Sequence, residues 1–105
     1  MWHLKYLNRK WTKEYNCYDF VLDVYKDHFG VDLQDAESFD DVSVKDLQEG
    51  DIVLLENDSQ VHAGIYVTDG YLLNLRKTSI GSELTHIDNF QSLGLRLSRC
   101  YRYAK

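Results

Sequence analysis

The sequence predicts a single α+β domain over residues 1–105, with one helix near the N-terminus packed on an antiparallel β-sheet. Two observations lead to this fold class. Apolar residues recur at helical spacing in residues 16–29, and short apolar or alternating runs follow between residues 52 and 103. One helical region followed by consecutive strands is typical of an α+β layout. A chain of 105 residues, 44% of them hydrophobic, is long enough for one modest core.

The first elements are an arm, a helix and a connection. Residues 1–15 carry aromatic side chains among basic ones, which predicts a short helix or an irregular arm near the helix start. The helix is predicted at residues 16–29, with an apolar stripe on one face and charges largely on the other. Gly30 is a favourable stop. Residues 31–44 are polar and acidic, and they predict a surface connection.

A cysteine stands at the first turn of this predicted helix. Asn16 is a favourable N-cap, and Asp19 adds a negative charge to the first turn. Cys17 is therefore expected where free N–H groups and the helix dipole favour the thiolate, the reactive form of a cysteine nucleophile. A buried structural cysteine is the alternative. A nucleophile also requires that Cys17 and Cys100 do not form a disulfide.

Five strands are predicted after the connection. Residues 52–55 form an unbroken apolar run, which is typical of a strand covered on both faces. The other four strands combine apolar or alternating residues with flanking turn residues. They are predicted at residues 61–67, 71–76, 83–87 and 95–103. Together these strands predict an antiparallel meander.

His62 is the candidate partner of the cysteine, because a strand is a rigid place from which to direct an imidazole. Gly64 lies on the same face and removes bulk beside it. A thiolate–imidazole pair also needs a third polar group that orients the ring, and Asn74 is the candidate. A three-residue loop at 68–70, with Gly70 left-handed, places Asn74 opposite Gly64 and diagonal to His62 on its face.

The alternative turn gives a different outcome. If Asp69 and Gly70 form a two-residue type I′ turn with a regular ladder, Asn74 points to the opposite face of the sheet. The triad hypothesis therefore predicts the three-residue loop. His86 is the second candidate for the orienting group, with an exposed structural histidine as the alternative interpretation.

Three segments, in this order, resemble the signatures of the NlpC/P60 family of papain-like cysteine peptidases. Residues 16–21 (NCYDFV) match a cysteine that opens a helix, and residues 47–53 (LQEGDIV) match a strand entry. Residues 62–70 (HAGIYVTDG) match a strand that begins with a histidine and ends in a glycine turn. The resemblance extends over residues 16–87, and the first motif is most similar to the phage-associated branch. It implies a papain-like α+β fold.

The resemblance also implies an activity. It implies Cys17 as nucleophile, His62 as base and Asn74, twelve positions later, as the third polar residue of a Cys-His-Asn triad. The implied reaction is hydrolysis of peptide bonds in the peptidoglycan stem peptides of bacterial cell walls. Two alternatives stay open: a binding or assembly module, such as a phage tail component, that keeps the fold without turnover, and acyl transfer to an amine or glycan.

Three tyrosines are candidates for the substrate groove, namely Tyr15, Tyr18 and Tyr66, although aromatic residues are more often part of a core. The NlpC/P60 family places a tyrosine hydroxyl near its cysteine, and the resemblance leaves Tyr6 and Tyr15 as alternatives for that position. Tyr18 departs from the small residue that commonly follows the family's cysteine.

The net charge and the lack of long apolar runs indicate which partners the protein is not expected to bind. The net charge of -5 disfavours nucleic acid, because surfaces that bind it gather Lys and Arg. No apolar run reaches the length of a signal peptide or of a membrane span, so we expect synthesis in the cytoplasm and no membrane partner. An extracellular role would involve release or a place in a virion, with a phage tail or other structural protein as partner. No clustered ligand set predicts a metal, and no cofactor is expected.

Overall fold

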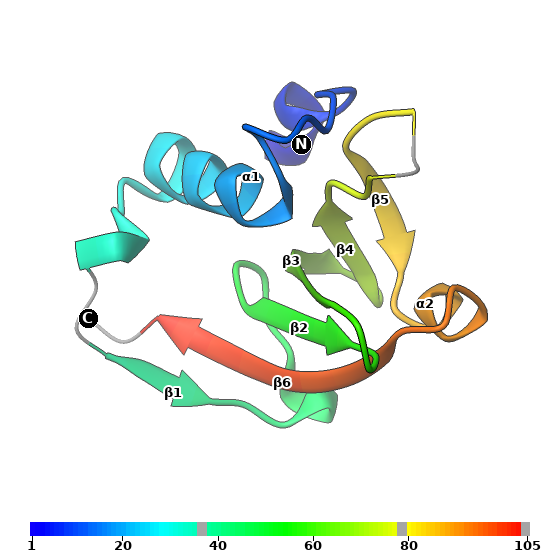
Figure 1. Ribbon diagram of the computed structural model, residues 1–105. Helices are drawn as coiled ribbons and strands as arrows, with labels where there is room; N and C mark the ends of the chain where they lie inside the picture. The colour runs from blue at the N-terminus through cyan, green and yellow to red at the C-terminus, as the bar shows by residue number, and fades with distance from the viewer. Residues whose placement is uncertain (36–37, 78–79, 104–105) are drawn as a thin grey trace.

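A computed structural model describes residues 1–35, 38–77 and 80–103 as an α+β fold built on one antiparallel sheet (Figure 1). The sheet has six strands in the spatial order β1-β6-β2-β3-β4-β5. Their bounds are β1 Phe39–Asp41, β2 Ile52–Glu56, β3 Val61–Thr68, β4 Tyr71–Asn74, β5 Glu83–His86 and β6 Arg96–Tyr103. The α-helices are α1 Cys17–Val24 and α2 Asn89–Ser92, and the shorter helical segments are η1 Trp2–Tyr6, η2 Tyr25–Phe29, η3 Leu33–Asp35 and η4 Val44–Asp46.

The helix predicted at residues 16–29 is present, but it changes form halfway. Residues 17–24 are α-helical, and residues 25–29 continue as one π-helical segment. Gly30 ends it as predicted, with φ at 70° in the left-handed region that glycine adopts without strain. Among the described residues, no helix has the length and apolar character needed to cross a membrane.

Two elements differ from the sequence-based expectation. β1 lies inside the acidic segment predicted to be a surface connection, and it pairs with β6 at the edge of the sheet. All three of its residues are exposed, so no apolar alternation marks it as a strand. The short helix α2 follows β5 and buries Phe90 against the sheet, although its sequence contains too few residues for a helical period.

The core is divided between the two faces of the sheet. On one face, α1 buries Phe20 and Val24 against alternate residues of β3, such as Ala63 and Ile65. On the other face, a second cluster gathers around Phe90. Its buried members are Val53, Leu55, Leu72, Phe90, Leu95 and Cys100. Both faces of β2 and β3 are therefore covered, as the unbroken apolar run of β2 predicted.

The segment before β2 is fixed by an ion pair between the buried Asp51 and the partly exposed Arg102. Asp51 is 1% exposed, and its carboxylate accepts hydrogen bonds from the guanidinium of Arg102 at 3.0 and 2.9 Å and from the backbone N–H of Gln48 at 2.8 Å. The backbone of Gly50 has φ at 93°, which favours glycine there. These contacts give the strand-entry motif of residues 47–53 a structural role.

The β3–β4 hairpin combines the two turns considered from the sequence. Asp69 and Gly70 both have positive φ, at 53° and 85°, and Thr68 pairs with Tyr71, as in a two-residue turn. The predicted three-residue loop is therefore wrong. However, the register shifts between Tyr66 and Thr68, so the strands beyond this β-bulge pair as the triad hypothesis required.

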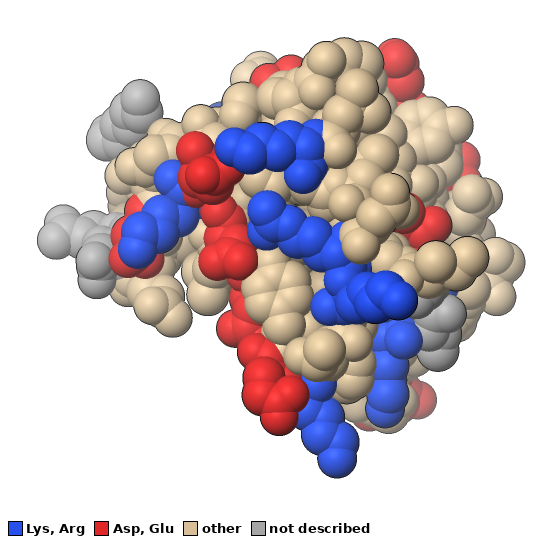
Figure 2. Space-filling model, turned by 90° about the horizontal axis from the view of Figure 1, so that it is seen from above, with Lys and Arg blue, Asp and Glu red and all other residues tan. Residues whose placement is uncertain are grey.

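The N-terminal arm packs beside α1 and the loop before β5 (Figure 1). Ser82 holds it: the Ser82 hydroxyl donates to the carbonyl of Tyr6 at 2.5 Å and accepts from the N–H of Arg9 at 2.9 Å. The backbone groups of Asn8 and Arg9 also bond to Ser82. Figure 2 shows that Lys and Arg side chains on this side of the molecule lie beside a row of Asp and Glu side chains.

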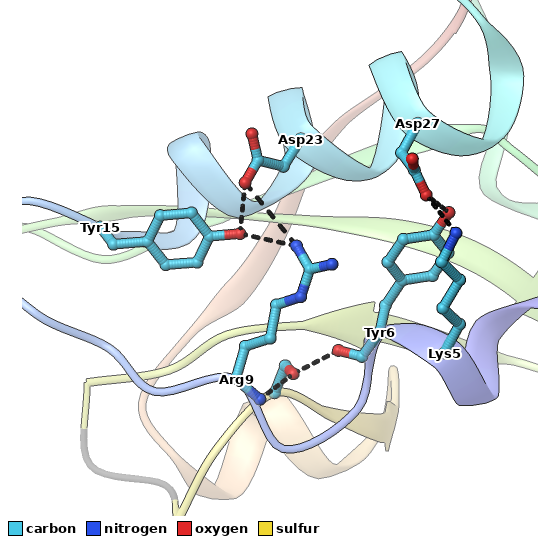
Figure 3. Close-up of polar contacts among 7 residues, drawn as sticks. Lys5, Tyr6, Arg9, Tyr15, Asp23 and Asp27 are labelled. Carbon is cyan, nitrogen blue, oxygen red and sulfur yellow. Dashed lines mark hydrogen bonds and ion pairs between the residues drawn. The ribbon is translucent and has the colours of Figure 1, made fainter.

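Polar side chains connect the arm to the exposed face of α1 and η2 (Figure 3). Asp27 accepts hydrogen bonds from Lys5 and Tyr6, and Asp23 accepts from the hydroxyl of Tyr15 at 2.9 Å. Arg9 donates to the same hydroxyl at 3.1 Å. These polar contacts add to the buried packing of the arm, in which Tyr6 is part of the core and the Trp2 ring stacks on His28 of η2.

Candidate active site

A buried hydrogen bond joins the predicted base to the predicted third residue. Nε2 of His62 lies 3.0 Å from Oδ1 of Asn74. The bulge described above puts Asn74 opposite Gly64, so both side chains lie on one face of the sheet. An added Cβ on Gly64 would lie 3.3 Å from Cβ of Asn74. The glycine therefore allows the close approach of the two strands at this point.

The surroundings of Asn74 fix the direction of its amide. Its Nδ2 faces three acceptors, namely the carbonyl oxygens of Leu72 and Glu83 at 3.1 and 3.3 Å and the hydroxyl of Thr85 at 3.0 Å. Oδ1 is consequently the atom that faces His62, and it accepts a hydrogen from Nε2. The neutral imidazole then has its proton on Nε2, which leaves Nδ1 as the basic nitrogen.

The cysteine lies at the same end of β3. Cys17 is 8% exposed and is the first residue of α1. Its thiol is next to the backbone N–H of Ala63, the residue that follows His62 in β3. Among the described residues, no hydrogen bond joins Cys17 to His62. The imidazole of His62 packs near Phe90, with the two ring centroids 5.7 Å apart. Both cysteines are free thiols, so the disulfide alternative does not apply.

The predicted helix cap is formed beside the thiol. Asn16 Oδ1 accepts hydrogen bonds from the N–H groups of Tyr18 and Asp19, and the Asp19 carboxylate accepts from the N–H of Asn16. This capping box confirms the predicted N-cap. It also uses two of the N–H groups that were expected to favour the thiolate.

The pKa of Cys17 is raised from its ordinary value, which corrects the expectation of a stabilised thiolate. Burial is the main cause and outweighs the backbone N–H groups of Ala63, Tyr18 and Cys17 itself, while Asp19 raises the pKa further. The pKa of His62 is lowered, again mainly by burial, although the hydrogen bond to Asn74 opposes the shift. Burial therefore favours the uncharged form of each group, the thiol of Cys17 and the neutral imidazole of His62.

The second candidate for the orienting group lies elsewhere. The Nδ1 atom of His86 accepts the N–H of Asp88 at 3.2 Å, and its ring packs edge-on against Tyr71. Asn74, not His86, is the side chain bonded to His62.

The three tyrosines named as substrate candidates occupy different surroundings. The hydroxyl of Tyr15 bonds to Arg9 and Asp23, and the hydroxyl of Tyr66 accepts the N–H of Gly70 at 3.1 Å. Tyr18 is 45% exposed. Burial raises its pKa most, and the charge of Cys17 raises it further, which places the phenol within electrostatic range of the sulfur. A role of these tyrosines in substrate binding stays a prediction.

Neither Tyr6 nor Tyr15 directs its hydroxyl to the cysteine. These hydroxyls donate to Asp27 and Asp23, which lie further along the helix. Sequence reasoning also missed Thr85, which fixes the amide of Asn74. The alternation of side-chain direction along the strands could have predicted this contact. Thr85 of β5 lies opposite Leu72 of β4, and Leu72 shares a face of the sheet with Asn74.

A cavity of about 270 Å³ opens beside His62. It lies where β3 begins and β4 has ended, and the segment between α2 and β6 closes it. Its lining residues are Gln60, His62, Arg76, Lys77, Leu93 and Leu95. Among the residues that the structure describes, no three or more His, Cys, Asp or Glu side chains cluster as a metal site would need.

These features define a class. The chain is an α+β protein in which a cysteine opens a helix packed on an antiparallel sheet, and a buried His–Asn pair lies on the adjoining strands.

The comparisons with known proteins specify the family. The NlpC/P60 family model matches residues 6–96, so the chain belongs to the NlpC/P60 family, as the three motifs indicated. The chain is also similar to the crystal structure of the NlpC/p60 domain of the peptidoglycan hydrolase SagA, with 15% sequence identity and a TM-score of 0.72. That match covers 96% of this chain and 92% of the other. No curated protein matches the chain. The predicted α+β fold is confirmed, and it is the fold of an NlpC/P60 domain.

Proposed function

We propose that the protein is a cysteine peptidase that hydrolyses peptide bonds in peptidoglycan stem peptides, with Cys17 as nucleophile and His62 as base. The observation that carries this proposal is the buried bond between His62 and Asn74, which leaves Nδ1 as a proton acceptor at the end of β3 where the thiol lies. Membership of the NlpC/P60 family supports a substrate in the cell wall.

The protonation states that burial favours determine the order of events. Nδ1 of His62 removes the thiol proton as the sulfur attacks the carbonyl carbon, because burial favours the protonated thiol before substrate binds. Asn16 uses the N–H groups of Tyr18 and Asp19, so the N–H of Cys17 is the helix-terminal donor for the oxyanion. The imidazolium then protonates the leaving amine. Water finally hydrolyses the thioester and returns the thiol.

The proposal is tested with purified muropeptides and mass spectrometry of the products. We expect Cys17→Ala and His62→Ala each to abolish cleavage while the circular dichroism spectrum stays unchanged. Cys100→Ala is the matched control, because Cys100 is also a buried free thiol but lies on β6. Cleavage at the wild-type rate by either active-site variant would refute the proposal.

One observation favours a different function, namely a binding or assembly module without turnover, such as a phage tail component. The raised pKa of Cys17 and the lowered pKa of His62 describe an unactivated pair. Alkylation of Cys17 by iodoacetamide, measured in a Cys100→Ala background, should rise as pH passes above the ordinary thiol pKa of 9.0. If the protein is a peptidase, bound stem peptide should change the pH dependence of this alkylation. If it is an assembly module, the pH dependence should stay the same and no peptide should be cleaved.

A further inference from the structure

The cavity beside His62 is built from two strand ends and one closing segment. Gln60 and His62 are two residues apart at the start of β3, so their side chains share one face. Arg76 follows Asn74 by two residues and reaches the same cavity. Leu93 and Leu95 form the opposite, apolar wall. The cavity is therefore adjacent to the proposed base and open to a substrate held there.

The charge of this cavity differs from that of the whole chain. The chain has a net charge of -5, yet the described lining contains two cationic side chains, Arg76 and Lys77, and no carboxylate. The Glu83 carboxylate pairs with Arg76 from outside the lining, so the cavity keeps one unbalanced positive charge, which attracts an anionic group.

Contacts outside the cavity hold both cations in place. Glu83 bonds to the guanidinium of Arg76 at 2.7 Å, and the Arg76 side chain is only 22% exposed. The ammonium of Lys77 lies 5.2 Å from the centre of the Trp11 ring, which restrains an otherwise exposed side chain. The positive charge of Arg76 also lowers the pKa of His62, after the larger effect of burial, so this cation lies within electrostatic range of the base.

The side chains that line the cavity indicate which kind of ligand fits it. A guanidinium and an ammonium bind a carboxylate through charge-assisted hydrogen bonds. The two leucines accommodate a short aliphatic chain, and the amide of Gln60 can bond to a peptide group.

We propose that this cavity binds a carboxylate of the substrate, either of an acidic side chain or of the peptide end, with Arg76 as the principal anchor and Lys77 at the mouth. The inference rests on the proposed function and deepens it. The preferred substrates are then stem peptides with a free carboxylate near the cleaved bond, rather than amidated ones.

Binding is tested without turnover in the Cys17→Ala variant. The probes are N-acetyl-D-glutamate and its diamide, and the readout is the NMR signal of the His62 ring, assigned by comparison with His62→Ala. We expect the acid to shift this signal and to bind about tenfold more tightly than the diamide. Arg76→Gln should abolish that preference, and Lys77→Gln should reduce it about threefold.

Arg99→Gln is the matched control, because Arg99 also pairs with a carboxylate, Asp41 at 3.1 Å, but does not line the cavity. It should keep the full preference for the acid. Equal binding of acid and diamide, an unshifted His62 signal, or equal losses in the Arg76→Gln and Arg99→Gln variants would overturn the inference. Lys77→Gln gives an independent result if Arg76→Gln fails to fold.

Hydrolysis by the wild-type protein separates this inference from the proposed function. If the protein binds the acid selectively but cleaves no muropeptide, the peptidase proposal fails and the carboxylate site stands. If it cleaves free and amidated stem peptides with equal kcat/KM, the peptidase proposal stands and the carboxylate site fails.

Discussion

The two sides of the proposed active site are held by different kinds of contact. His62 is positioned by Asn74, which is fully buried and whose polar atoms face partners within the sheet. Cys17 begins a helix whose outer face is attached to the N-terminal arm by partly exposed groups such as Lys5 and Asp27 (Figure 3). The polar contacts on the sheet side are therefore protected from water, whereas the polar contacts between the arm and the outer face of the helix are partly solvated.

The difference has an energetic consequence. A buried polar group that loses its partner costs about 1–3 kcal/mol, because it gave up water to enter the protein. An exposed ion pair contributes about 0–1 kcal/mol, because water and salt screen it. We conclude that the buried hydrogen bonds that position the imidazole contribute more to stability than the exposed ion pairs of the arm, whose attachment depends mainly on buried residues such as Tyr6. Substitutions on the two sides test this contrast.

The largest effect is expected for Asn74→Ala. The substitution leaves Nε2 of His62 and the hydroxyl of Thr85 without their buried partner, so unfolding free energy should fall by about 2–4 kcal/mol. Urea denaturation measures it. Asn57→Ala is the control, since Asn57 accepts hydrogen bonds from Ser59 and Gln60 in an exposed turn. A similar loss in both variants would contradict the contrast between buried and exposed contacts.

An intermediate effect is expected for Asn16→Ala, which removes the helix cap. Two N–H groups lose their acceptor, and unfolding free energy should fall by about 1 kcal/mol. Asn16→Asp should restore most of this stability, because aspartate is an equally good cap. A stability unchanged in the alanine variant would show that packing alone fixes the start of α1.

The smallest effect is expected for Lys5→Gln. The ion pair with Asp27 measures 2.8 Å, but the two side chains are 68% and 50% exposed. The change in unfolding free energy should be below about 0.5 kcal/mol and should vanish at high salt. A loss above about 1 kcal/mol at moderate salt would mean that this exposed ion pair contributes as much as a buried hydrogen bond.

Local signals made part of the molecule predictable. The cap at Asn16 and the stop at Gly30 depend on neighbouring residues, and both were identified from the sequence. Strand β1 could not be identified from the sequence, because its exposed residues form a strand only by pairing with β6, about sixty positions later. Likewise, the pKa of Cys17 follows from burial under elements distant in sequence, whereas the sequence revealed only its helix-terminal position.

The sequence predicted the contact between Asn74 and His62 correctly, but it predicted the wrong hairpin turn. Asn74 reaches His62 as expected, but through a bulge near Val67 rather than a three-residue loop. Asp69 and Gly70 suit either turn, so the local sequence does not decide between them. The choice depends on the packing of Leu73 and Ala63 in the core beneath α1.

The bulge in β3 constrains how this hairpin can change in evolution or in the laboratory. At the bulge, two residues of β3 lie opposite one residue of β4, so a regular ladder of the same length from the same two-residue turn would shift the pairing by one residue. That shift would move Leu73 away from the core beneath α1 and turn Asn74 away from the histidine in a single event. Removing the extra bulge residue would instead leave Tyr66 next to Thr68 and keep Gly64 opposite Asn74, so we expect this deletion to preserve the pairing on which the histidine depends.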